Sequence, residues 1–436
     1  MVLLYAAAAG ALLALVCLWF SLRAGRRQRL VDNLPTSKTT GVFIGLVDLN
    51  GTAEVEKPLL SYLTQTQCVL YGWQVEEHWS RTVIETYTDG EGHTQTRTRT
   101  ESGWTTVAKG GEEGLFYLKD DCGVIRIQPA GAKIEPKTIM DTTCGMGDPL
   151  YYGMGPPGAI GDSDHRRRFT ESAIPLHAQL YVMGQARERD DVVAPELAAN
   201  KQAPLFLIST RTEKQVSKGF RLQFWLLGLL GLVLCVGSLV VGAAQSHHNP
   251  SAEIPLFVGA GSVYVVAWLL GWVWMVYNGM IELRQRVRQG WANVDVQLKR
   301  RHDLVPNVVS LVTGLRDYER TVQTEVAALR SQLGATPPGQ PGPDPAGCQP
   351  ILRAIAEAYP DLKANASFMD LQRQLVDTEQ RIALARSYFN DIATFYNTRV
   401  QVIPDRFIAA LGGMQPQTLM AAAGFERAPE QVVLAG

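Results

Sequence analysis

Three long apolar stretches divide an otherwise mixed sequence. Residues 2–22, 222–245 and 256–280 contain no charged side chain, and each reaches the ~20 apolar residues that a membrane-spanning helix needs. The pattern therefore predicts three transmembrane helices. No cationic residue precedes the first stretch and four arginines follow it within residues 23–29, so we expect an uncleaved anchor rather than a signal peptide.

The cationic residues around the second and third stretches predict the orientation of the chain. Lys and Arg precede the second stretch within residues 214–221 and follow the third within residues 284–288, whereas the link at 246–255 contains neither. Positively charged flanks tend to stay on the cytoplasmic side of a membrane. We therefore expect a multi-pass protein of the cytoplasmic (inner) cell membrane, with both large polar regions in the cytoplasm.

The region between the first and second apolar stretches has the pattern of a β-rich domain. Residues 33–220 alternate short β-prone runs with turn signals. In the run CVLYGWQVEEHW, Tyr71 and Trp73 fall on the same face, as the two-residue period of a strand requires. Asp89 and Gly90 are turn formers followed by alternating Thr and Arg, which predicts a solvated β-hairpin.

Four segments of this region resemble the GIDE-type domain, a module found beside a membrane in the mitochondrial ubiquitin ligase MULAN and in bacterial relatives. They are PLLSYLTQTQCVLYGWQVEEHW, FYLKDDCGVIRIQPAGA, RRFTESAIPLHAQLYVMGQA and LFLISTRTEKQV. The resemblance implies a β-rich domain next to a membrane span. MULAN also carries a RING after its last span, and this chain has no Cys/His array that could bind two zinc ions, so we do not expect ligase activity.

Candidate catalytic groups are dispersed along the chain. The six cysteines share no CxxC or CxxH spacing, so neither a zinc site nor a disulfide framework is expected. His165, in DSDHRRRF, fits a solvated charge cluster, and Cys68, in a β-prone run, fits a core position. We expect no catalytic residue, no cofactor and no metal. The alternative is an enzyme within the β-rich domain, which needs two or three titratable groups converging in one pocket.

Beyond the third apolar stretch the sequence acquires a helical heptad pattern. Positions recur at spacings of three and four, with one arginine among apolar residues, at Val287, Trp291, Val294, Leu298, Arg301 and Val305. The third span runs directly into this pattern. Pro306 then indicates either the first turn of a second helix or a kink.

A second long helix is predicted nearer the end of the sequence. The Pro/Gly segment GATPPGQPGPDPAG at 334–347 predicts a flexible linker. After Asn365 the three-four spacing resumes and includes Phe389 and Tyr396. Long heptad helices bury their apolar seams against one another, so we expect an antiparallel bundle.

Two long segments of this half resemble the LemA family. They are VRQGWANVDVQLKRRHDLVPNVVSLVTG and AYPDLKANASFMDLQRQLVDTEQRIALARSYFNDIATFYNTRVQVIPDRFIA. The resemblance implies a membrane helix followed by a cytoplasmic helical bundle, and a link to membrane organisation and stress. His302 stands where that family usually has Tyr, which argues against a catalytic role for this histidine.

Together these patterns and resemblances predict a multi-domain α+β membrane protein. Its expected parts are transmembrane helices at 1–22, 222–245 and 256–280, a GIDE-like β-rich domain at 33–220, and a LemA-like antiparallel α-helical bundle at 281–436.

We expect this protein to act as a non-enzymatic membrane scaffold, with the lipid bilayer and further copies of itself as partners. Nucleic-acid binding by KRRH is not expected, because the basic residues are few and lack an aromatic platform. The bundle seam closes either within one chain or between chains. The residues expected to carry these helix contacts are Trp291, Leu298, Arg301, Pro306, Phe389 and Tyr396.

Overall fold

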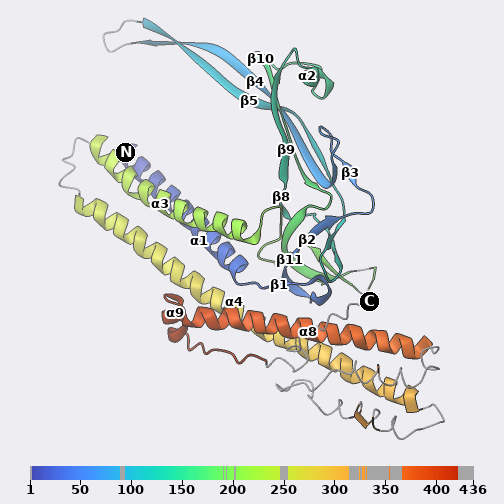
Figure 1. Cartoon of the computed structure of the whole chain (residues 1–436). Coiled ribbons are helices and arrows are strands. Elements are labelled where there is room, and N and C mark those ends of the chain that lie inside the picture. Colours follow the sequence, from blue (N-terminus) through green and yellow to red (C-terminus); the bar gives the residue numbers. More distant parts are fainter. Residues whose placement is uncertain are drawn as a thin grey trace, which may run out of the picture. The chain divides into compact units, whose positions relative to one another are not determined.

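The computed structural model shows an α+β chain made of two compact units (Figure 1). It describes residues 2–88, 94–189, 191–192, 194–200, 203–245, 254–313 and 366–420, with a few isolated positions between 314 and 365. The expected linker at 334–347 lies outside the described residues. Unit 1 comprises Met1–Pro35 and Glu213–Gly436, and unit 2 comprises Thr36–Thr212.

Part of the larger sheet of unit 2 closes into a small barrel. Pairings run from β2 through β6, β7, β12 and β11, and β11 also pairs with β2, so these five strands form a ring. Closure leaves no free edge within the ring. The sheet consists of β1 (Thr36–Ser37), β2 (Gly45–Glu54), β6 (Phe116–Lys119), β7 (Val124–Ile127), β8 (Lys133–Glu135), β11 (Gln179–Glu188), β12 (Pro195–Ala198) and β13 (Leu207–Ser209).

Apolar side chains at alternate strand positions fill this barrel. Phe116 and Leu118 of β6 are buried, as are Ile125 and Ile127 of β7, while their neighbours along each strand are more exposed. This two-residue period is the one that the sequence pattern predicts for strands with differing faces. The core cluster also contains Val47, Leu49, Ile174, Val182, Leu197 and Ile208.

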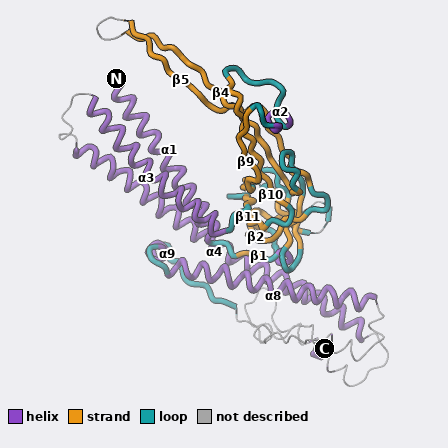
Figure 2. The backbone as a smooth tube through the Cα atoms, turned by 45° about the horizontal axis from the view of Figure 1, so that its top comes forward, coloured by secondary structure: helices purple, strands orange, loops and turns teal. Residues whose placement is uncertain are grey.

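The second sheet of unit 2 carries a long hairpin (Figure 2). Strands β4 and β5 pair antiparallel from Leu70 opposite Glu113 to Thr88 opposite Thr94. The predicted hairpin is therefore confirmed, and its tip lies outside the described residues. The sheet consists of β3 (Leu59–Leu60), β4 (Gln67–Thr88), β5 (Thr94–Glu113), β9 (Lys137–Gly145) and β10 (Ser163–Pro175), and the helix α2 (Pro149–Gly153) lies between β9 and β10 in sequence.

Unit 1 contains three long apolar helices that lie side by side (Figures 1 and 2). They are α1 (Val2–Asp32), α3 (Glu213–Gln245) and the first part of α4 (Ile254–Thr313). Each is long and apolar enough to cross a membrane. The hydroxyl of Ser21 donates to the Phe224 carbonyl at 2.7 Å, and that of Tyr264 donates to the Gly228 carbonyl at 3.1 Å. Residues 213–220, expected in the β-rich domain, belong to α3.

Helix α4 continues far beyond its apolar part and passes through Pro306 without ending. Of the two alternatives for this proline, a second helix that begins here is wrong, and a kink stays a prediction. Proline removes one backbone hydrogen bond from a helix, but Val305 and Val308 on either side of it are buried, at 1% and 0% exposure. Packing of this apolar face therefore keeps the helix continuous, while Pro306 itself is exposed.

Helix α8 (Ala366–Gln401) packs antiparallel against the second part of α4. The ring of Trp291 lies against that of Phe389, and ten residues further along α4 Arg301 approaches Glu379, ten residues earlier on α8. Contact positions that run in opposite directions define an antiparallel pair. The short helix α9 (Asp405–Leu411) follows α8 and contacts both α8 and α4.

Candidate functional site

The α4–α8 seam brings together most of the residues that the heptad pattern singled out. The rings of Trp291 and Phe389 meet edge to face, with their centroids 5.7 Å apart. Leu298 is 2% exposed and Tyr396 is fully buried. Pro306 is the exception, since it lies on the exposed side of α4. In this structure α4 and α8 of one chain form the seam, and a seam shared between chains stays the other alternative.

Two polar side chains lie within this apolar seam. Arg301 is 3% exposed, and its Nη1 lies 3.8 Å from Oε1 of Glu379. The hydroxyl of Tyr396 is buried and has no hydrogen-bond partner within the described residues. Burial raises the pKa of Tyr396 above its ordinary value, so the phenol stays neutral. Both groups fit a packing role, since both side chains are buried within the seam.

A buried carboxylate that sequence reasoning missed joins the ends of three helices, and a second carboxylate links α1 to α3. Asp405 of α9 accepts two hydrogen bonds from Arg29 of α1, at 2.9 and 3.1 Å, and Arg399 of α8 lies 3.6 Å away. Arg399 also donates to the Asn33 side chain at 2.9 Å. On α3, Ser217 donates to Asp32 of α1 at 2.5 Å. In sequence Arg29 is only one of several arginines flanking an apolar stretch.

The three candidate reactive residues do not converge. Cys68 is buried, and burial raises its pKa to about 11, so its thiol is protonated at neutral pH. It pairs with Pro175 at one end of β10, whereas His165 lies near the other end and is exposed. His302 lies on an exposed face of α4 in the other unit. The Cys68 thiol donates to the Leu59 carbonyl, at 3.6 Å, and the Nδ1 of His165 lies 3.5 Å from the Tyr151 hydroxyl, so the three residues belong to separate environments.

A fully buried ion pair lies in unit 2, where Arg167 of β10 contacts Glu77 of β4. Two hydrogen bonds join their side chains, at 3.0 and 3.1 Å, and both residues have 0% exposure. Glu77 also accepts from the hydroxyls of Tyr151 and Ser163. Burial by itself raises the pKa of Glu77, but the hydrogen bonds from Ser163, Arg167 and Tyr151 outweigh it and hold the pKa below its usual range.

The remaining donors of Arg167 fix the neighbouring loop. Its guanidinium donates to the carbonyls of Tyr151, Pro156 and Gly158, at 2.8, 2.8 and 2.7 Å. The segment GMGPPG at 153–158 is thus a structural Pro/Gly loop, with an arginine as its support. Arginine offers five donors in a fixed plane, and this environment uses them within the protein, so the cluster is a packing centre rather than an open acid–base site.

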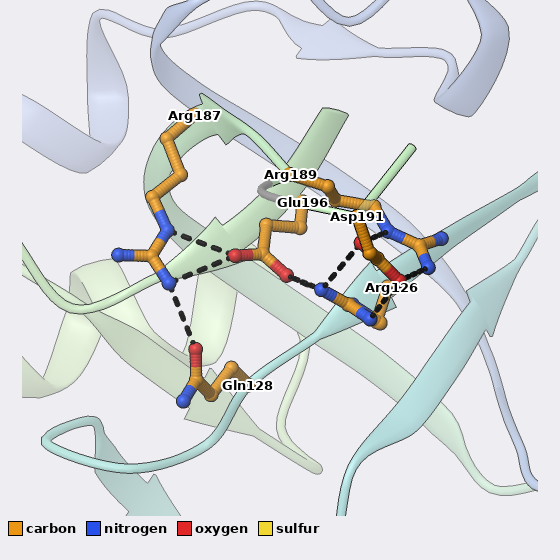
Figure 3. Close-up of polar contacts among 6 residues, drawn as sticks. All are labelled: Arg126, Gln128, Arg187, Arg189, Asp191 and Glu196. Atoms are coloured by element: carbon orange, nitrogen blue, oxygen red, sulfur yellow. Dashed lines mark hydrogen bonds and ion pairs between the residues drawn. The ribbon is translucent and has the colours of Figure 1, made fainter. Parts of the chain in front are cut away.

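A second ionic network links β7, β11 and β12 (Figure 3). The carboxylate of Glu196, 2% exposed, accepts from Arg126 at 2.8 Å and from Arg187 at 2.9 Å. Arg189 pairs with Asp191 at 2.6 Å, and Arg126 reaches the same carboxylate at 3.3 Å. Hydrogen bonds from the two arginines outweigh burial and hold the pKa of Glu196 below its ordinary value. The network joins neighbouring strands of the sheet.

One group of side chains has the donor types of a metal site. The ligand atoms of Asp120, Asp121 and Cys122 lie within 4.8 Å of one another. The Asp120 carboxylate, however, already accepts from the backbone and hydroxyl of Thr39, at 2.8 and 2.6 Å, and from the backbone of Cys122 and Gly123. Its oxygens therefore fasten a turn to residue 39.

Two family models match two separate parts of the chain. The model of the LemA family matches residues 290–433, which include α8, α9 and the later part of α4. The GIDE model, described as an E3 ubiquitin ligase, matches residues 85–242, which run from the β4–β5 hairpin into α3.

Three curated relatives are magnetosome proteins. Magnetosome protein MamQ of Magnetospirillum gryphiswaldense is 21% identical over 173 residues, which cover 32% of this chain and 63% of that protein. Magnetosome proteins MamQ 1 and MamQ 2 of Paramagnetospirillum magneticum are each 20% identical over 203 residues, which cover 37% of this chain and 74% of theirs. The chain thus spans less than two thirds of the first of these relatives.

Both resemblances inferred from the sequence are confirmed: the chain joins a GIDE-type region at residues 85–242 to a LemA-family region at residues 290–433.

Proposed function

We propose that this protein is a non-enzymatic, integral membrane scaffold of the LemA type that assembles with itself. The observation that carries the proposal is helix α4, which extends without a break from its apolar part into the packed seam with α8. A continuous helix transmits position and orientation along its whole length. Inserted in a bilayer, α4 would hold the LemA-like helices at a fixed place on the membrane surface.

The polar clusters of unit 2 support a structural role. The buried groups Glu77, Arg167 and Glu196 use their hydrogen-bonding atoms on one another or on the backbone. An enzyme needs titratable groups that converge on a space open to substrate. The ligase description attached to the GIDE model favours an enzyme as the second candidate, but the sequence offers no paired Cys/His motifs for a RING.

The remaining parts of the proposal concern place and partners. Three apolar helices and their cationic flanks support a multi-pass protein of the inner membrane, with both units in the cytoplasm. The matched relatives carry names that record no enzymatic activity. If the α4–α8 seam is used within one chain, self-assembly relies on other surfaces, and confinement to a membrane raises the effective concentration for it.

The mass of the particle extracted in polymer-bounded lipid discs, without detergent, tests self-assembly. We expect a multiple of the 47.9 kDa chain, and the mass of one chain would contradict the proposal. Substitution of His165, Cys68 and His302 by Ala should leave insertion and assembly unchanged. If any of these variants lost its membrane phenotype while still folded, inserted and assembled, the enzyme alternative would replace the scaffold.

A further inference from the structure

The turn after α8 and the short helix α9 expose an unusual set of large apolar side chains. Ile403 is 67% exposed, Phe407 62% and Leu411 88%. Phe407 and Leu411 are four residues apart on α9 and therefore share one face, and Ile403 lies in the turn just before it. We call these three residues the α9 stripe. Adjacent large apolar residues this exposed indicate a binding surface.

The opposite side of α9 packs against the rest of unit 1. Asp405, Ile408 and Ala409 are buried. The Asp405 carboxylate is held by two hydrogen bonds from Arg29 of α1. After the helix, a Cβ at Gly412 would lie only 3.0 Å from the ring of Tyr277 on α4. The α9 stripe is thus fixed in place beside two of the apolar helices.

The attachment points of α9 mark a level along those apolar helices. Tyr277 lies in the last turn of the uncharged stretch 256–280, and Arg29 follows the uncharged stretch 2–22 by seven residues. Seven helical residues rise about 10 Å, so Arg29 lies slightly beyond the roughly 5–8 Å that the headgroup region adds on each side of the hydrocarbon core. With the apolar helices inserted as proposed, α9 lies at the boundary between acyl chains and headgroups.

The surroundings of Asp405 have the chemistry of that boundary. A cavity of about 200 Å³ is lined by Arg29 and Arg399, which contact Asp405, by Arg221 and Asp32, and by the aromatic residues Phe224, Trp225 and Trp272. Arg221 on α3 and Arg406 on α9 are both exposed. Aromatic side chains collect at membrane interfaces, and free cations there attract lipid phosphates.

We propose that residues 402–411 form an interfacial membrane anchor, in which the α9 stripe enters the outer acyl region of an anionic bilayer and the exposed Arg221 and Arg406 face its phosphate groups. This inference rests on the proposed insertion of the apolar helices. It adds a contact with the leaflet surface that holds the end of α8 down on the membrane, next to the point where α4 leaves it.

The test is photocrosslinking of the full chain in vesicles of phosphatidylcholine and phosphatidylglycerol. Phe407→p-benzoylphenylalanine changes the side chain least, since it keeps the aromatic ring. Two matched positions serve as controls: Leu226 on the apolar part of α3, 57% exposed, and Val296 on the later part of α4, 61% exposed. We expect lipid adducts from positions 407 and 226 and none from position 296.

Each result has a separate meaning. Loss of lipid adducts at both 226 and 407 would overturn the proposed insertion, and the anchor with it. Adducts at 226 without adducts at 407 would overturn the anchor alone. Crosslinked dimers from position 407 in place of lipid adducts would show that the α9 stripe binds a second copy of the chain.

A second variant tests the stripe itself. With the probe at position 407, Leu411→Asp should abolish the lipid adducts, because a carboxylate disfavours the acyl region. Unchanged adducts in this variant would overturn the proposal that the α9 stripe enters the bilayer.

Discussion

At the scale of single residues, unit 2 relies on buried charges whose partners are all within the protein. Arg167 and Arg168 are neighbours on β10 with opposite environments. The first is fully buried against Glu77, whereas the second pairs with Asp141 at the surface, with side-chain exposures of 43% and 49%. Adjacent arginines on one strand therefore allow a buried ion pair to be compared directly with an exposed one.

We expect Arg167→Met to destabilise unit 2 by about 3–5 kcal/mol, because it leaves the Glu77 carboxylate buried without its cation. It also releases the three loop carbonyls that Arg167 holds. Arg168→Met should leave unit 2 nearly unchanged, since water screens the exposed pair. Hydrogen exchange of the β10 amides in the full chain measures both effects. Equal protection in the two variants would show that the buried pair adds nothing to stability.

The lowered pKa of Glu196 makes a prediction about pH. A carboxyl whose folded pKa lies below its unfolded value stabilises the fold above the unfolded value, near 4.3, and loses that contribution as the pH falls towards the folded pKa. The midpoint temperature of thermal unfolding, followed by the circular dichroism of the β-sheet, should therefore decrease when the pH is lowered below about 5.

The matched variant for this pH effect is Glu196→Gln, which cannot ionise. It should unfold at a lower temperature than the parent at neutral pH, because Arg187 loses its anionic partner and Arg126 keeps only Asp191. The difference between the two proteins should shrink in acid. If the difference in midpoint temperature between the two proteins stayed constant from neutral pH into acid, the pH dependence would belong to other carboxyl groups.

At the scale of helices, the α4–α8 pair is held by packing along one seam. Phe389 and Phe395 lie on the same helix, but Phe389 is 6% exposed against the ring of Trp291, whereas Phe395 is 37% exposed. Phe389→Ala should cost about 3–5 kcal/mol through the cavity it leaves. Phe395→Ala should cost much less, because it opens no enclosed space. Amide exchange of α8 in the full chain distinguishes the two.

At the scale of the whole molecule, the cationic flanks predict that both units face the cytoplasm. Topology reporters inserted at Asp162 and fused after Gly436 should then behave alike, and a reporter at Asn249, in the link between the second and third apolar stretches, should behave oppositely. Agreement between the reporters at Asp162 and Asn249 would reject the arrangement with three spans. As a control, the chain that carries the reporter at Asn249 should be expressed at the same level as the chain without it, which shows that the reporter does not disturb membrane insertion.

Much of the organisation of this chain follows from its sequence, because it depends on local regularities. Uncharged runs identified the apolar helices, and a three-four spacing identified the seam residues Trp291, Leu298 and Phe389. Segments that resemble the two families identified the GIDE-type and LemA-family regions. A period or a run depends on neighbours along the chain, so no knowledge of distant contacts is needed to recognise it.

Only the tertiary structure decided which charged residues are paired and which apolar residues stay exposed. In sequence, Arg29 and Arg167 each belong to a basic run, and Ile403, Phe407 and Leu411 look like any other apolar positions. The structure pairs Arg29 with Asp405, 376 residues away, and Arg167 with Glu77, and it leaves the α9 stripe open. Burial and pairing depend on residues far away in the chain, so a local pattern cannot specify them. The same reason explains why Pro306 did not end α4: the buried face around it outweighs one missing hydrogen bond.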